Sequence, residues 1–105
     1  MLFIFPEETQ AAFWMKNTPI SLDLIFINQE GVIVDIIEKA VPFSENLLIP
    51  KASYFYVLEV TGGTVQRRVI RIGDSAAQLP VVVPRHSGLG SHPRSRALWA
   101  VAASS

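Results

Sequence analysis

The sequence predicts a single, mainly β domain with one short helix, and three observations lead to this class. The chain has 105 residues, a length that suits one domain. Half of its residues are hydrophobic, and they gather in short runs rich in β-branched and aromatic side chains. Turn-forming residues separate these runs, a pattern typical of strands joined by loops. No apolar run approaches the roughly 18 residues of a membrane span, and no signal peptide is visible.

Two short strands are expected near the N-terminus. Leu2 to Phe5 is an apolar run closed by Pro6. Ala12 to Asn17 is rich in aromatic residues and ends at the turn signal Asn17-Thr18-Pro19.

A β-hairpin is predicted next. Leu22 to Asn28 and Val32 to Glu38 are both rich in β-branched and aromatic side chains. The segment Asn28-Gln29-Glu30-Gly31 joins them, and Gly31 can adopt the left-handed conformation that closes such a loop. We expect the two strands to pair antiparallel, with one face of each strand buried.

The middle of the chain predicts a loop followed by a further strand. Residues 40–53 contain Pro42 and Pro50 and have the composition of a loop. Tyr54 to Val60 is again β-branched and aromatic, so it predicts a strand.

The helix is expected directly after this strand. Gly62-Gly63 turns the chain, and Thr64 can cap a helix of barely two turns, Val65 to Arg68. A last strand piece is predicted over Val69 to Ile72, before Gly73-Asp74.

The composition changes near residue 74. Residues 1–74 hold all nine acids and six of the nine bases, whereas residues 75–105 hold three arginines, no acid and many small or turn-forming residues. The later segment has neither helical nor strand periodicity. We therefore predict a β-rich domain over residues 1–75 and a disordered or non-native tail over residues 76–105.

Charge and residue types disfavour several classes of function. The formal net charge is zero, which argues against nucleic acid or an anionic membrane as partner. Without cysteine there is no disulfide or thiol nucleophile. His86 and His92 lie in the tail, so we predict no metal site, no cofactor and no Ser-His catalysis in the body. Arg67, Arg68 and Arg71 lack interleaved aromatic residues and predict a solvated face.

The candidate site is a polar group within apolar sequence. On an extended strand Trp14 and Lys16 face the same side, so the lysine stem can rest on the indole ring. If residues 12–17 paired with residues 22–27, Lys16 and Asp23 could approach each other. The candidate polar cluster consists of Trp14, Lys16, Asn17, Asp23 and Glu59, with no catalytic residue assigned.

Three interpretations of this cluster stay open. An enzyme could use Lys16, Asp23 and Glu59 for acid-base chemistry on a small or carbohydrate-like ligand, with Trp14 as a platform, because burial and like charges separate pKa values. The charges could instead form a buried pair that only fixes strand register. For the charges themselves we favour the buried pair, because no nucleophile beside a base accompanies the cluster. For the domain as a whole we favour a third interpretation, a small accessory or ligand-binding module.

One glycine-rich segment has a similar ambiguity. Gly62-Gly63-Thr64 at a helix start could offer backbone N–H groups to a phosphate. A flexible turn followed by an N-cap is the simpler interpretation, and we prefer it.

Seven sequence blocks carry a family resemblance. They are, in order, Met1-Leu2-Phe3-Ile4-Phe5, Phe13-Trp14-Met15-Lys16-Asn17-Thr18, Ile20-Ser21-Leu22-Asp23-Leu24-Ile25-Phe26-Ile27, Gly31-Val32-Ile33-Val34, Tyr56-Val57-Leu58-Glu59, Gly63-Thr64 and Gly73-Asp74. Together they resemble the uncharacterised prokaryotic family known as domain of unknown function 192, over residues 1 to about 75. The resemblance implies a small, mainly β domain with barrel-like or sandwich packing, in a family without an established activity.

The chain departs from the family pattern at its start and at the helix end. The family usually has an N-terminal strand before the Met-Leu-Phe block, so the resemblance implies a chain that begins inside the domain and exposes a strand edge. Self-association through that edge is therefore expected, beside an unknown small-molecule or protein partner. Val69 stands where a glycine commonly ends the short helix. Some relatives are exported, and the location of this chain is left open.

Overall fold

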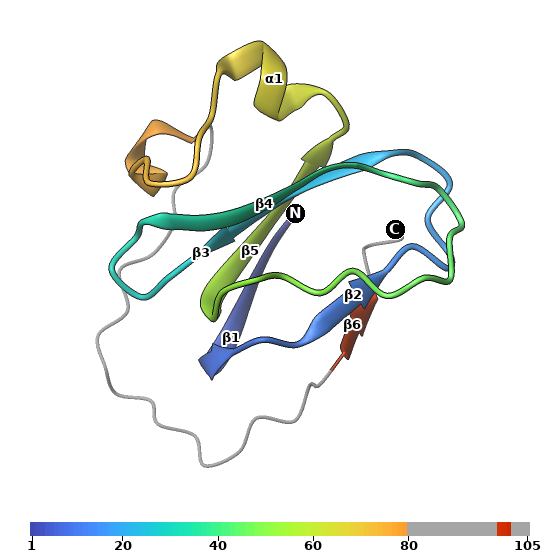
Figure 1. Ribbon diagram of the computed structural model, residues 1–105, viewed down its shortest axis with the longest axis horizontal. Coiled ribbons are helices and arrows are strands. Elements are labelled where there is room, and N and C mark those ends of the chain that lie inside the picture. Colours follow the sequence, from blue (N-terminus) through green and yellow to red (C-terminus); the bar gives the residue numbers. More distant parts are fainter. Residues whose placement is uncertain (80–98, 102–105) are drawn as a thin grey trace.

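The computed structural model describes residues 1–79 and 99–101, and Figure 1 shows their arrangement. The predicted class is confirmed, because the described residues form a mainly β structure with a single short helix. In chain order the elements are β1 (Leu2–Thr9), β2 (Ala12–Trp14), β3 (Leu22–Ile27), β4 (Ile33–Ala40), β5 (Tyr54–Thr61), α1 (Thr64–Arg68), the 3-10 turn η1 (Ala76–Gln78) and β6 (Trp99–Val101).

Four strands form one antiparallel sheet with the order β1-β5-β3-β4. The predicted β3–β4 hairpin is confirmed, and the Asn28 Oδ1 atom accepts a hydrogen bond from Val32 N (2.9 Å) within its turn. Gly31 has a φ angle of +82°, the left-handed conformation expected for it. Within the described residues the sheet stays open, with β1 and β4 at its edges, and does not close into a barrel.

β3 lies in the middle of the sheet and is buried along its whole length. The prediction that only one face of this strand is buried is therefore wrong, because both faces of the sheet are covered. Because successive side chains of a strand point to opposite faces, Leu24 and Phe26 lie in one core cluster, which we call the first. Ile25 and Ile27 lie in the other, the second core cluster. Residues of β2 and the following turn pack on the first face, whereas α1 and the segment after it pack on the second.

Phe13 of β2 is central to the first core cluster. Its ring lies 6.1 Å from the ring of Phe3, 5.8 Å from Phe26 and 6.3 Å from Tyr54, measured between centroids. The Tyr54 hydroxyl donates a hydrogen bond to Ala11 O (2.7 Å), and burial raises the pKa of Tyr54 above its ordinary value. These contacts fix β2 to the sheet.

The first two strands differ in length from the prediction. β1 continues through Pro6, because this strand is at an edge, where a missing N–H group need not remove a ladder hydrogen bond. β2 is shorter than predicted, because Thr18 N donates to Met15 O (3.1 Å) and closes a turn directly after Trp14.

Both ends of α1 also differ from the prediction. Gly63, with a φ angle of +97°, is the N-cap residue in place of Thr64. No strand forms over Val69 to Ile72, since Val69 ends the helix with a φ angle of +55° and a ψ angle of 51°. This left-handed residue turns the chain, and Ile70 packs into the second core cluster.

Part of the segment predicted as a tail is described. Ala76 and Leu79 are buried in the second core cluster, and β6 pairs in parallel with β2. Residues 80–98 and 102–105 lie outside the described residues. The domain boundary at residue 75 and the disordered or non-native tail stay predictions.

Candidate functional site

Asp23 is fully buried on β3, and backbone N–H groups surround its carboxylate. The Oδ1 atom accepts hydrogen bonds from Lys39 N (2.8 Å) and Gly63 N (3.2 Å), and the Oδ2 atom accepts from Gly63 N (3.1 Å) and Val65 N (2.8 Å). A helix leaves its first N–H groups without intrahelical partners, and a carboxylate can satisfy them. Asp23 therefore caps α1 from a neighbouring strand and also holds the end of β4.

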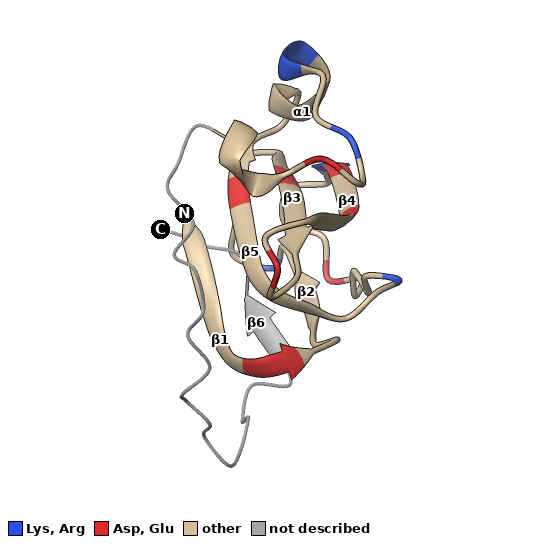
Figure 2. Cartoon of the chain, turned by 90° about the vertical axis from the view of Figure 1, so that its left-hand side faces the viewer, with Lys and Arg blue, Asp and Glu red and all other residues tan. Residues whose placement is uncertain are grey.

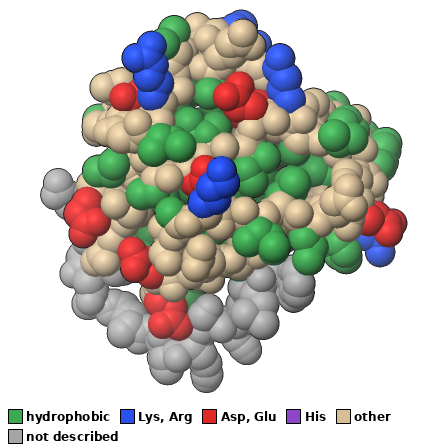
Figure 3. Space-filling model, in the orientation of Figure 1, with side chains coloured by type: hydrophobic (Ala, Val, Ile, Leu, Met, Phe, Trp, Pro, Cys, Tyr) green, Lys and Arg blue, Asp and Glu red, His purple; other side chains and the backbone are tan. Residues whose placement is uncertain are grey.

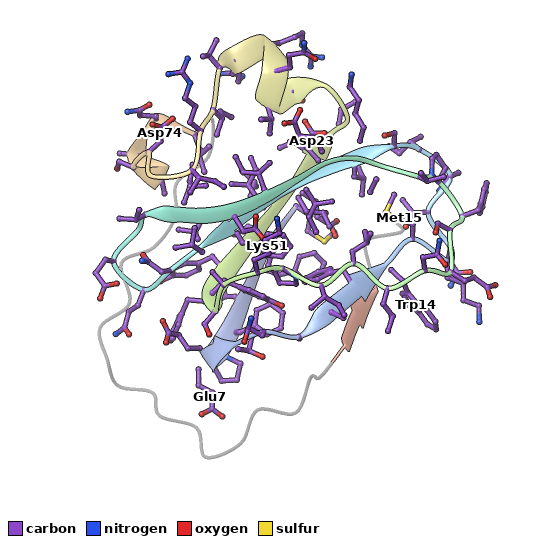
Figure 4. The ribbon with its side chains drawn as sticks, viewed as in Figure 1. Glu7, Trp14, Met15, Asp23, Lys51 and Asp74 are labelled. Atoms are coloured by element: carbon purple, nitrogen blue, oxygen red, sulfur yellow. The ribbon has the colours of Figure 1, made fainter. Side chains whose placement is uncertain are left out.

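Lys16 lies away from this carboxylate. The neighbours of β3 are β4 and β5, so residues 12–17 do not pair with residues 22–27, and the condition for a contact between Lys16 and Asp23 is not met. Lys16 is exposed, and its Nζ atom lies 5.3 Å from the centroid of the Trp14 ring. The expected stacking of lysine on indole is therefore present, as a cation-π contact. Figure 4 shows Asp23 beside α1 and Trp14 beyond β2.

Glu59 and Asp23 face opposite sides of the sheet. Asp23 is paired with Val60 of β5, and Glu59 is paired with Leu24 of β3. Successive residues of a strand point to opposite faces, so the two acids are separated by the sheet itself. Glu59 is buried. The structure thus brings Trp14 and Lys16 together, whereas Asp23 lies on the opposite face of the sheet from β2, beside α1. A functional role for each residue stays a prediction.

The Gly62-Gly63 pair is explained by packing and capping. Gly62 N donates to Ser21 O (2.9 Å), and a Cβ atom at Gly62 would lie 2.6 Å from the Ser21 Oγ atom. The N–H groups of Gly63 and Val65, which a bound phosphate would need, are donated to Asp23. The geometry favours a turn over a phosphate site.

Two loops that are distant in sequence meet beyond the sheet. Met15 N donates to Ser44 O (3.1 Å), and Phe43 N donates to Thr18 O (2.9 Å). Phe13 and Leu48 exchange backbone hydrogen bonds of 2.9 and 2.6 Å. The loop after β2 and the loop after β4 are therefore held side by side (Figure 1).

These two loops expose large apolar side chains. We call them the apolar loop surface, and they are Ile20, Val41, Phe43, Leu47 and Ile49. Hydrophobic side chains are visible at the right-hand end and along the lower right of the molecule in Figure 3, where the loops lie in Figure 1. Several large exposed apolar side chains on neighbouring loops of a small domain are typical of an interaction site. Sequence reasoning missed this surface, because a loop that spreads its apolar residues irregularly shows no period.

Phe43 is the most unusual residue of this surface. Its φ angle is +59°, and Ser44 N donates to Val41 O (3.2 Å), so Pro42 and Phe43 are the central residues of a β-turn. A positive φ angle at the second central position is typical of type II turns and favours Gly or Asn. Phe43 is also 60% exposed, so its side chain adds little packing to the core that could offset the strain of its backbone.

Trp14 is half-buried and lies on β2, whose neighbouring residue Phe13 pairs with Leu48 of the loop after β4. Its Nε1 atom is buried and has no hydrogen-bond acceptor among the described residues. A buried indole N–H group usually finds an acceptor, because leaving one unpaired costs about 1–3 kcal/mol.

Metal and membrane sites find no support in the described part of the chain. Residues 1–79 contain no group of three His, Cys, Asp or Glu residues that could hold a metal ion. No helix among the described residues is long and apolar enough to cross a bilayer.

Two solved structures have the same fold. One is a protein from Sinorhizobium meliloti 1021 that is provisionally described as a transcription regulator, with 44% identity and a TM-score of 0.69 over 71% of this chain and 58% of that chain. The other is a protein of unknown function from Novosphingobium aromaticivorans DSM 12444, with 37% identity and a TM-score of 0.69 over 71% of this chain and 54% of that chain. Both organisms are bacteria, and this chain spans less than two thirds of either relative.

The sequence comparisons agree with this fold match. None of the curated proteins compared with the chain matches it. The profile of a family of unknown function, DUF192, described as "Uncharacterized ACR", matches residues 1–77. The chain therefore belongs to the DUF192 family, to which no activity is assigned.

Proposed function

We propose that this domain is a non-catalytic binding module for a protein partner and that the apolar loop surface is its contact site. The observation that carries the proposal is Phe43, an exposed aromatic side chain on a backbone conformation that favours glycine, on a loop that also exposes Leu47 and Ile49. Such a residue stabilises neither its turn nor the core. A contact with a partner would account for both the strained backbone and the exposed ring of Phe43.

The surroundings of Phe43 fit a protein contact. Leu47 and Ile49 follow it on the same loop, and Trp14 lies on the adjoining strand with Lys16 over its ring. Interfaces commonly bury an aromatic and aliphatic centre and keep charged groups at the rim. This arrangement supports a partner with an apolar contact segment.

The enzyme alternative has less support. Acid-base work by Lys16 with Asp23 would need the two groups near one ligand, yet Lys16 is exposed beside Trp14 and Asp23 is buried beside α1. Each oxygen of the Asp23 carboxylate already accepts two hydrogen bonds from backbone N–H groups. These contacts favour a structural role for Asp23.

Peptide selection tests the proposal. A random peptide library displayed on phage is panned against the full chain, and the affinities of selected peptides are measured by fluorescence anisotropy. We expect Phe43→Ser and Ile49→Ser to weaken binding about tenfold or more. Ile72→Ser is the matched control, since Ile72 and Ile49 are 61% and 62% exposed and Ile72 lies near α1. Failure to select peptides, or equal affinity in all variants, would reject the proposed contact site.

We propose a second contact at the open edge of β1. Met1 and Glu59 exchange backbone hydrogen bonds, each of 2.8 Å. Strand alternation then directs the backbone groups of Leu2 and Ile4 away from β5. Ile4 is 57% exposed, so this edge offers both N–H and C=O groups and an apolar side chain to a second copy.

Sedimentation velocity over a concentration series tests this edge. We expect a dimer that grows with concentration in the unmodified chain and is absent in Ile4→Lys, because a charged side chain at an edge opposes strand pairing. A monomer at every concentration, or a dimer that Ile4→Lys leaves intact, would reject the self-association.

A further inference from the structure

The two edges of β2 have different partners. Phe13 N and Phe13 O both bond to Leu48, at 2.9 and 2.6 Å. Backbone groups of successive strand residues point to opposite sides, so those of Ala12 and Trp14 point away from Leu48. β6 lies on that second edge and runs parallel to β2, with Ala12 opposite Trp99 and Phe13 opposite Ala100. We call this side the outer edge of β2.

The surroundings of the outer edge are apolar. Ala11, Ala12 and Phe13 are buried, and Trp14 is half-buried. The Nε1 atom of Trp14 is buried and has no acceptor among the described residues. The strand seated here has the sequence Trp-Ala-Val, which contains no charge and no proline. An extended apolar segment with free backbone N–H groups suits this edge best.

The segment that connects Leu79 to β6 does not restrict the outer edge of β2 to β6 alone. Residues 80–98 join Leu79 to β6, and nineteen residues can span at most about 60–70 Å. The longest dimension of the molecule is 35 Å. A parallel pair needs only a long connection and no tight turn, so an equivalent strand from outside the chain can have the same pairing.

We propose that the outer edge of β2 is a strand-addition site for an extended, uncharged, apolar peptide segment that runs parallel to β2. β6 occupies this site in cis, and a segment of another polypeptide competes with it. Backbone hydrogen bonds supply affinity in this mode of recognition, and side chains at alternate positions supply specificity. The site does not involve the apolar loop surface, so it stands or falls separately from the proposed function.

The test weakens the cis strand in the full chain and offers a strand in trans. Ala100→Pro removes the N–H group of the residue opposite Phe13. The probe is a labelled peptide with the sequence Ala-Leu-Trp-Ala-Val-Ala, that of residues 97–102, and its binding is followed by fluorescence anisotropy. We expect Ala100→Pro to bind the peptide about tenfold or more tightly than the unmodified chain, because the site is vacant in a larger fraction of molecules. The same peptide with proline in place of its central alanine is the control and should not bind.

Hydrogen exchange locates the effect. In Ala100→Pro, protection of the Trp14 amide should fall and return when the peptide is added, whereas the Phe13 and Leu48 amides should stay protected in both states. Phe43→Ser should leave peptide binding unchanged. The proposal is overturned if the peptide fails to bind Ala100→Pro, if the proline peptide binds equally well, or if Trp14 exchange does not respond.

Discussion

Two regions of the molecule are held in place by the same device. In the α1 region, residues 62–74, the buried Asp23 accepts hydrogen bonds from N–H groups of two different elements. In the loop region, residues 41–53, the buried Asp35 of β4 accepts from Lys51 N (2.7 Å) and from the N–H group of its own neighbour, Ile36 (2.8 Å). Each aspartate uses a sheet strand as a fixed support for a segment that has little regular structure of its own.

The two regions also share a strained, exposed residue. Val69 in the α1 region and Phe43 in the loop region have φ angles of +55° and +59°, and each is 60% exposed. Their neighbours differ. In Figure 2 the ribbon of α1 and of the segment after it is blue at its basic residues, Arg67, Arg68 and Arg71, which are exposed. The loop of Phe43 also exposes the apolar side chains of Leu47 and Ile49. Strain alone is therefore a poor sign of function, and the surroundings of the strained residue separate the two cases.

Removing Asp23 should have the largest effect. Asp23→Ala leaves the N–H groups of Lys39, Gly63 and Val65 without their acceptor, and we expect a loss of about 3 kcal/mol or more in the free energy of unfolding. Urea denaturation measures this loss. Asp23→Asn keeps one carbonyl oxygen as acceptor and should lose less. A loss for Asp23→Ala no larger than that for Asp35→Ala would contradict the difference between the two regions.

Removing Asp35 should have a smaller and more local effect. Asp35→Ala frees Lys51 N and Ile36 N, and an unpaired buried group costs about 1–3 kcal/mol. Hydrogen exchange should show the Lys51 amide losing protection while the Val65 amide keeps it. Equal loss at both amides would mean that the two regions unfold together, and the comparison would then break down.

Glycine at the two strained positions should separate strain from function. Val69→Gly and Phe43→Gly each remove the left-handed penalty of a larger residue, and we expect each to gain about 0.5–1 kcal/mol in unfolding free energy. Phe43→Gly should also weaken binding of the selected peptides, whereas Val69→Gly should leave it unchanged. If Val69→Gly and Phe43→Gly change the affinity for the peptides equally, the surroundings of the two residues do not distinguish their roles.

The sequence predicted the local parts of this structure better than the pairings between distant segments. The β3–β4 hairpin follows from β-branched runs and from Gly31, all within 17 residues (22 to 38). The burial of Asp23 could also be expected from its apolar neighbours, but its partners could not, because they depend on β4 and β5 flanking β3. The β-branched side chain of Val69 predicts a strand and carries no sign of the left-handed turn that the residue forms. Proline at position 42 marks a turn but does not show that Phe43 points to solvent.

The smallest effect is expected at Lys16, the residue on which the sequence-based cluster depended. A buried partner of Asp23 would make Lys16→Met strongly destabilising, since breaking a buried pair costs about 3–5 kcal/mol. Lys16 is instead exposed above Trp14, and exposed cation-π contacts contribute about 0.5–1 kcal/mol. We therefore expect Lys16→Met to lose less than about 1 kcal/mol in urea denaturation. A loss near that of Asp23→Ala would contradict the exposed position of Lys16 and support the buried-pair interpretation instead.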